Sequence, residues 1–218
     1  MRQNQYTPLK ERVREYLMQK IEAGELKEGD KIVELNVCDE LGVSRTPVRE
    51  ALNQLSTDGY LENVPRKGFR VKGFDEESAG FIFEIIGPLD GRAALLALPN
   101  MDKGDITQLK FLCASMDIAL ESSLYDRYDD LQQEFHFLYI DKCGNPKLSS
   151  LLHDLWRFFS KASYSIKDDQ KAIANLKLAN EEHREIVTLF EKSDGKALQD
   201  YIRDVHWKLE NAQYATWQ

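Results

Sequence analysis

Apolar and polar positions follow two different periods along the first third of the chain. Between Thr7 and Gly24, apolar residues recur every three to four positions after a Thr-Pro start, which predicts an amphipathic helix. Two more helical stretches follow, and then two short strand-like runs enclose a Pro-Arg-Lys-Gly turn. After the first helix, the expected elements are helices over 34–41 and 44–58 and strands over 60–64 and 69–71. The expected packing positions of the helix over 34–41 are Leu35, Val37, Cys38 and Leu41.

The start of the third predicted helix carries the most specific local pattern. Gly42 permits a tight turn after the short helix, and the Ser44 hydroxyl is expected to cap the next one. Arg45, Thr46 and Arg49 then project from the leading end of that helix, where helix-turn-helix proteins meet bases and phosphates. Candidates for contact with double-stranded DNA at this helix start are therefore Ser44, Arg45, Thr46 and Arg49.

A basic hairpin follows the three helices, with Arg66, Lys67 and Gly68 in its predicted turn. Three helices followed by such a hairpin predict a winged helix-turn-helix, whose wing lies along DNA. Taken singly, the helix start is equally typical of an ordinary capped surface helix, and a basic turn is usually just solvated. Their succession favours DNA binding.

From residue 74 onward the hydrophobic pattern is helical almost throughout. Asp75 is expected to cap a helix that Pro88 kinks and that ends at Pro99-Asn100, and Asp102 begins the next one. No alternating strand pattern competes. We therefore expect a mainly α protein, with the winged helix-turn-helix followed by an all-α antiparallel helical bundle. The remaining helices are expected over 125–143, 147–164 and 170–192 and from about 196.

Length and charge agree with two domains, 1–73 and 74–218. The net charge of the 218-residue chain is −8, yet residues 1–73 hold 13 Lys and Arg against 12 Asp and Glu, so the acidic excess lies in the second domain. A nearly neutral DNA-binding domain predicts modest affinity and favours a dimer on two half-sites. Three scattered cysteines, no signal segment and no apolar run of about 18 residues predict a cytoplasmic protein with no membrane partner.

Three histidines on apolar helical faces are the candidate metal ligands: His136, His183 and His206. Neutral imidazoles are good ligands for zinc, nickel and similar ions, and three such faces could converge inside a bundle. Any one of them alone is more often a hydrogen-bonded core histidine. His153 lies on a mixed face and is expected to be structural or exposed.

Residues 9–71 resemble the DNA-binding domain of the GntR family of bacterial transcription regulators. The run Val-Ser-Arg-Thr-Pro-Val-Arg-Glu-Ala-Leu at 43–52 carries most of this resemblance. It implies that the two arginines and the threonine of the run contact DNA, and that the wing glycine approaches it closely. Many members have an arginine where this chain has Leu35, so one expected DNA contact is missing. The other matching segments are Gly24-Glu25-Leu26, Gly29-Asp30-Lys31-Ile32, Asp58-Gly59 and Pro65-Arg66-Lys67-Gly68.

Residues 77–210 resemble the FCD ligand-sensing domain of the FadR-type branch. This resemblance implies that the three histidines hold a divalent metal ion, zinc or nickel, which helps to bind a small carboxylate effector. Family members place Asp or Asn four residues before the first histidine, whereas this chain has Gln132, a poor ligand. The alternative is a metal-free pocket in which the histidines donate hydrogen bonds to an anionic effector. The landmarks are Phe135-His136, Gly144-Asn145-Pro146, Glu182-His183-Arg184 and His206.

Four residues are the candidate effector-binding side chains: Gln132, Arg92, Tyr139 and Arg157. Arg92 shares a helical stripe with apolar residues, which would place it either at a pocket wall or, through its long side chain, in solvent. Arg157 is a weaker candidate of the same kind. Gln132 and Tyr139 share a helix face with the first histidine.

The sequence thus predicts a metabolite-responsive transcription regulator, most often a repressor in this family, that binds a palindromic operator as a homodimer. Effector binding would shift the population between two conformations and change the affinity for DNA. The main alternative is a metal-dependent enzyme whose three histidines activate water, although no motif places an acid or base beside them. A third possibility is an architectural DNA-binding protein with a purely structural bundle.

Overall fold

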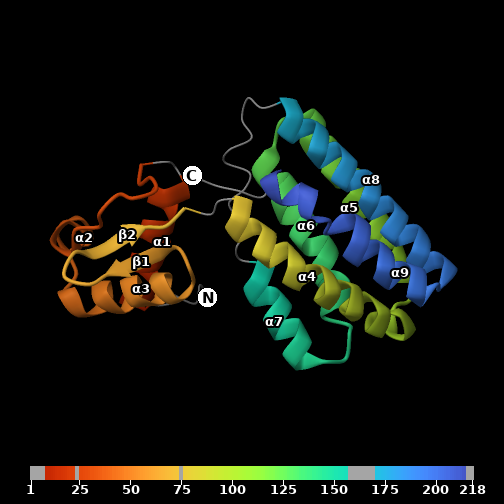
Figure 1. Ribbon diagram of the computed structural model, residues 1–218, viewed down its shortest axis with the longest axis horizontal. Helices are drawn as coiled ribbons and strands as arrows, with labels where there is room; N and C mark the ends of the chain where they lie inside the picture. Colours follow the sequence, from red (N-terminus) through yellow and green to blue (C-terminus); the bar gives the residue numbers. More distant parts are fainter. Residues whose placement is uncertain (1–7, 23–24, 74–75, 157–169, 215–218) are drawn as a thin grey trace, which may run out of the picture. The chain divides into compact units, whose positions relative to one another are not determined.

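A computed structural model describes residues 8–22, 25–73, 76–156 and 170–214 (Figure 1). These residues form two compact units that divide at Gly73. The first unit is a small helical domain with a two-stranded sheet, and the second is helical. This confirms the fold class expected from the sequence, a winged helix-turn-helix followed by a helical domain.

The first unit packs three helices around one small core. They are α1 (Leu9–Glu22), α2 (Glu34–Leu41) and α3 (Arg45–Thr57). Helix α1 lies against α3, and their contact buries apolar side chains that recur at helical spacing. The most deeply buried of these are Val13, Leu17, Val48, Ala51, Leu52 and Leu55.

Two antiparallel strands, β1 (Leu61–Val64) and β2 (Gly68–Val71), form the wing. Leu61 pairs with Val71 and Val64 with Gly68, so the turn occupies residues 65–67. Arg66 has a φ of 65° and Gly68 a φ of 86°, the left-handed region that a tight hairpin turn requires. Lys31 bridges to Arg70 on the open edge of β2, which joins the segment before α2 to the wing.

Two details of the first unit differ from the sequence prediction. Ser44 occupies the N-cap position of α3, but its hydroxyl makes no capping hydrogen bond. Leu35, expected among the packing positions of α2, is half exposed, because the buried face of this two-turn helix is covered by Val37 and Cys38. The predicted helix limits Thr7 and Gly24 lie outside the described residues.

The second unit contains helices throughout its described length, and none of them is long and apolar enough to cross a membrane. Helix α5 packs against α6 and α8, and α4 packs against α6, α7 and the C-terminal turns. The described helices are α4 (Glu76–Ala97), α5 (Lys103–Glu121), α6 (Tyr125–Ile140), α7 (Pro146–Trp156), α8 (Gln170–Lys192) and α9 (Gly195–Tyr201). The short turns are η1 (Leu98–Asn100), η3 (Ile202–His206) and η4 (Leu209–Tyr214).

Helix boundaries in the second unit mostly follow local sequence signals. Asp102 caps α5 in a reciprocal capping box with Asp105, as expected for its position. Pro88 lies inside α4, which continues for nine residues beyond it. The expected cap Asp75 and the last part of the helix predicted over 147–164 lie outside the described residues.

The end of α9 was not predicted as the structure has it. The chain passes from α9 into η3, one turn of π-helix, which the backbone N–H of Trp207 closes by bonding to the carbonyl of Ile202. Such turns are rare and are frequently found at functional sites. Here the turn carries His206 and directs it into the interior of the unit.

Candidate functional site

The leading end of α3 presents its polar side chains to solvent while its apolar face is buried. Arg45, Thr46 and Arg49 are exposed together with Ser44. Gly42 makes the turn before the helix with a φ of 63°, which glycine adopts without strain. The Nε–H of Arg49 donates to Glu34 of α2 at 2.8 Å, so this side chain has a fixed direction.

The wing carries a second group of basic side chains. Arg66 and Lys67 are exposed at the turn, and the half-buried Gly68 follows them. Lys31, which sequence reasoning did not single out, is exposed too, and its Cε lies within van der Waals distance of the position that a Cβ on Gly68 would take. Arg70 is directed elsewhere, because its guanidinium donates to the carbonyl of Gly29 at 2.6 Å. The backbone bridge from Lys31 to Arg70 of β2 brings this lysine to the wing, and the sequence pattern alone does not reveal that bridge.

Three histidines from three elements meet inside the second unit: His136 of α6, His183 of α8 and His206 of η3. The Nε2 atom of His136 lies 3.2 Å from Nε2 of His183 and 3.2 Å from Nε2 of His206. His136 and His183 are fully buried, and His206 is 8% exposed. The apolar stripes that carry these residues therefore converge.

Buried carboxylates fix the orientation of two of the three rings. Nδ1 of His136 lies 2.9 Å from Asp90 of α4, and Nδ1 of His206 lies 2.9 Å from Glu182 of α8. A carboxylate accepts hydrogen bonds, so each Nδ1 carries the proton and each Nε2 of the neutral ring presents a lone pair. Where both rings are neutral, two lone pairs face each other across 3.2 Å, an arrangement that repels unless a proton or a metal ion lies between them.

Asp90 also binds two donors besides His136. The Tyr139 hydroxyl donates to its Oδ1 at 2.8 Å, and the Trp207 indole N–H donates to its Oδ2 at 2.8 Å. Tyr139 lies at 2.6 Å from Nδ1 of His136 as well, so the Nδ1–H group is shared between the tyrosine oxygen and the carboxylate. Asp90 was missed by sequence reasoning, although the signal existed: it stands four residues after Ile86 and four before Ala94, in the buried stripe of α4.

Burial decides the protonation states around the cluster. Desolvation lowers the pKa of His136 and lowers the pKa of His183 well below its usual value, which keeps both rings neutral. Burial raises the pKa of the Tyr139 phenol well above its usual value, so this group remains a donor to Asp90. Among the described residues, no lysine or arginine contacts either Asp90 or Glu182. Two buried carboxylates thus lie beside a cluster of three imidazole rings.

The donor set fits a divalent metal ion. Imidazole nitrogens about 2.0–2.1 Å from a tetrahedral zinc are separated by roughly 3.3–3.4 Å, close to the 3.2 Å between the Nε2 atoms here. A dication would also balance the two carboxylates. Nδ1 of His183 differs from Nδ1 of the other two histidines, because it is buried without a hydrogen-bond partner among the described residues.

The other candidates from the sequence lie partly near the histidine cluster and partly away from it. Gln132 is half-buried one helical turn before His136, and Tyr139 belongs to the cluster through Asp90. Arg92 is exposed, so it lies at the surface and not at a pocket wall. Its stripe was misleading, because Ile85 in the same stripe is itself 48% exposed. Arg157 lies outside the described residues, and His153 is a partly exposed surface residue that bonds to Asp141.

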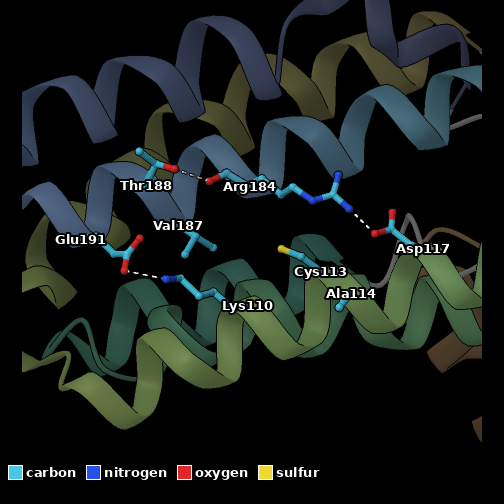
Figure 2. A pocket seen from close by; sticks show the side chains of 8 residues that line it. All are labelled: Lys110, Cys113, Ala114, Asp117, Arg184, Val187, Thr188 and Glu191. Atoms are coloured by element: carbon cyan, nitrogen blue, oxygen red, sulfur yellow. Dashed lines mark hydrogen bonds and ion pairs between the residues drawn. The ribbon is translucent and has the colours of Figure 1, made fainter.

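A cavity of about 290 Å³ lies between α5 and α8, is lined by none of the three histidines, and was not predicted from the sequence (Figure 2). Two ion pairs span it, Lys110 with Glu191 and Arg184 with Asp117. Cys113 contributes its sulfur to the wall, and burial raises the pKa of this thiol to about 12. The charged groups of the cavity are therefore already paired, and its thiol is protonated.

Comparison with known proteins agrees with both units. Residues 9–71 match the family of bacterial regulatory proteins named gntR, and residues 82–205 match the FCD domain. The chain is 30% identical over 183 residues to YdhC, an uncharacterized HTH-type transcriptional regulator of Bacillus subtilis (strain 168), which covers 82% of this chain and 79% of that protein. It is 34% identical over 97 residues to a probable D-xylose utilization operon transcriptional repressor of Paenarthrobacter nicotinovorans, covering 44% and 43% of the two chains.

The fold is shared with a solved structure as well. The structure of E. coli McbR/YncC superposes with a TM-score of 0.73 and 22% identity, covering 95% of this chain and 98% of that one. Members of the family regulate transcription, which sets the enzyme alternative aside. The chain therefore belongs to the GntR family, in the branch that carries an FCD domain, and is a DNA-binding transcription regulator.

Proposed function

We propose that this regulator is a cytoplasmic homodimeric repressor that binds a palindromic operator. The exposed residues at the start of α3 and in the wing support direct contact with DNA, through Arg45, Thr46 and Arg49 to bases and phosphates and through Arg66, Lys67 and Gly68 along the duplex. Two copies are proposed because one nearly neutral domain offers few phosphate contacts. The repressor assignment rests on the name of the Paenarthrobacter relative.

The second part of the proposal is a divalent metal site formed by His136, His183 and His206. One observation carries it: the Nε2 atoms of His136 and His206 lie 3.2 Å apart beside two buried carboxylates, with which no basic residue of the described part of the chain forms an ion pair. Burying such charge without compensation is costly. Zinc and nickel are among the ions that imidazole ligands suit and are the two proposed here.

The third part is a small carboxylate effector. With three protein ligands, a bound zinc or nickel ion supplies further coordination positions that a carboxylate can fill. Gln132 and Tyr139 flank His136 on α6 and are the proposed neighbours of that effector. Arg92 is not included, because its side chain is exposed.

Selection of DNA from a random duplex library tests the whole proposal. We expect the zinc-loaded protein to enrich a palindromic sequence and to bind it at least 1,000-fold more tightly than scrambled DNA, as is typical of specific binders. Acetate, malate and citrate then serve as probes of one, two and three carboxylates. One of them should weaken operator binding at least tenfold in the wild type and leave His183→Ala unaffected. Binding without sequence preference would contradict the proposal, and so would an equal carboxylate effect in His183→Ala.

A further inference from the structure

The Asp90 carboxylate lies where it can affect the positions of two of the three histidine rings. It is fully buried on α4 and receives three hydrogen bonds, from His136, Tyr139 and Trp207. His136 is itself a member of the cluster, and Trp207 directly follows His206 in the chain. One side chain thus contacts one ring and the turn that carries another.

The two bonds to Oδ2 have different consequences. The first holds the proton of His136 on Nδ1, so that the Nε2 lone pair faces the other two rings. The second fixes the indole of Trp207 at 2.8 Å, directly after the π-helical turn that the Trp207 backbone N–H closes. Since His206 is the last residue of that turn, the position of its ring depends on where Trp207 is held.

Close packing makes this arrangement rigid. A Cβ placed on Gly87 would lie 3.0 Å from the Cβ of Trp207, and one on Gly91 would lie 2.6 Å from the carbonyl oxygen of Gln199. The two glycines flank Asp90 on α4 and allow α9 and η3 to approach its backbone. Asp90 therefore reaches Trp207 and His136 without any intervening group.

We propose that Asp90 is the positioning residue of the three-histidine cluster, which sets the tautomer of His136 directly and the place of His206 through Trp207. The inference rests on the proposed metal site for its consequence in zinc affinity. Glu182 differs from Asp90, because among the described residues its one hydrogen-bond partner is His206. Asp90 acts on two ligands and Glu182 on one.

Tyr139 makes the tautomer directly testable. In the wild type its hydroxyl proton is directed to Asp90, so the oxygen accepts from His136. In Asp90→Leu, a residue of the same branched shape, that proton has no carboxylate to bind and turns to Nδ1 of His136. The ring then changes to the Nε2–H tautomer, which cannot bind a metal through Nε2.

Zinc titration of the full-length protein against a fluorescent chelator is the first test. Asp90→Asn should weaken zinc binding about 10- to 100-fold, and Trp207→Phe should weaken it by a smaller factor. The double variant should bind zinc no worse than Asp90→Asn alone, because Trp207 acts through the same oxygen. Glu84→Gln, an exposed carboxylate of the same helix, is the matched control and should bind as the wild type does. Additive losses in the double variant, or wild-type affinity in Asp90→Asn, would overturn the inference.

Long-range ¹H–¹⁵N spectra of the metal-free protein are the second test. The wild type should show His136 as the Nδ1–H tautomer and Asp90→Leu as the Nε2–H tautomer, with thermal melting used to verify that both proteins are folded. An unchanged tautomer in folded Asp90→Leu would refute the positioning role. If Asp90→Leu does not fold, the zinc affinities of Asp90→Asn, Trp207→Phe and the double variant decide whether Asp90 positions the cluster. If the wild type binds no zinc, the metal proposal fails while the tautomer still decides the role of Asp90.

Discussion

Arg49 of α3 is tied to Glu34 of α2 through a 2.8 Å hydrogen bond from its Nε–H to the carboxylate. This bond uses one edge of the guanidinium and leaves its two terminal nitrogens available to DNA. It also places a negative charge beside the surface that we propose to bind DNA phosphates. The same glutamate thus directs the arginine and opposes indiscriminate attraction to DNA.

We therefore expect Glu34→Gln to bind scrambled DNA more tightly and to lose roughly five- to tenfold in its preference for the operator. Fluorescence anisotropy on both duplexes at two salt concentrations measures this ratio. Glu50→Gln, an exposed glutamate on α3, makes the same change of charge without releasing Arg49. Equal behaviour of the two variants would show that Glu34 does not direct Arg49.

Lys31 should add one phosphate contact to those of the wing. Its side chain is exposed next to Gly68, and its backbone bridges to β2. In Lys31→Ala we expect weaker binding to every duplex, with the slope of log K against log salt reduced by about 0.9. Lys27→Ala, an exposed lysine four residues earlier, is the control. An unchanged slope in Lys31→Ala would remove this residue from the interface.

Two glycines of α4 should respond in opposite ways to a methyl group. Gly91→Ala places a Cβ 2.6 Å from the backbone oxygen of Gln199 and should destabilise the second unit by about 1–3 kcal/mol. Gly80→Ala meets nothing within 4 Å in the same helix and should stabilise it by roughly 0.5–1 kcal/mol. Urea unfolding followed by tryptophan fluorescence reports on this unit, because all three tryptophans of the chain come after residue 73. Changes of equal sign would argue against the close approach of α9 to α4.

The loss of unfolding free energy at acidic pH should depend on Asp105. The ammonium of Lys142, at 2.5 Å, and the backbone N–H of Asp102 lower the pKa of this carboxyl. Because the pKa of Asp105 is lower in the folded than in the unfolded protein, this carboxyl stabilises the fold fully above its unfolded pKa of about 4. The stabilisation is lost as the pH falls through the folded-state pKa. Asp105→Asn should therefore cost about 1 kcal/mol or less at pH 7, since the pair is partly exposed.

That difference in unfolding free energy should shrink as the pH falls from about 4, the unfolded value, through the lowered pKa of the wild-type carboxyl, and it should vanish once that carboxyl is protonated as well. A difference that persists at low pH would mean that Asn fails for another reason, such as its weaker fit to the capping box. Urea titrations of both proteins at pH 7, 5 and 3 provide the comparison.

The sequence predicts the winged helix-turn-helix well because its signals are local. Gly42, the Arg-Thr-Pro start of α3 and the Pro-Arg-Lys-Gly turn each fix a short piece of backbone. Side chains whose role depends on distant partners are harder to predict. Asp90 meets residues of α6 and of the C-terminal segment, so the importance of this one carboxylate follows only from the packing of α4 against both.

Arg92 and the turn at His206 show the same limit in different ways. The helical stripe of Arg92 left both a pocket wall and solvent open for this side chain, and the stripe faces solvent where Ile85 and Arg92 stand. The helical pattern continues through residues 202–206, so the π-helical geometry left no local trace. The cluster of three histidines was expected from resemblance, and its carboxylate partners came from the structure.

The metal content of the purified protein shows whether the three histidines form a metal site. Elemental analysis of the untagged protein should find about one zinc, nickel or similar ion per chain, and His183→Ala should lose it while remaining folded. The effector search would then concentrate on carboxylates that coordinate metals. If no metal is found in the wild type, even after loading with zinc or nickel, the three-histidine metal site is refuted. Asp90, Glu182 and the three rings would then form a purely hydrogen-bonded core.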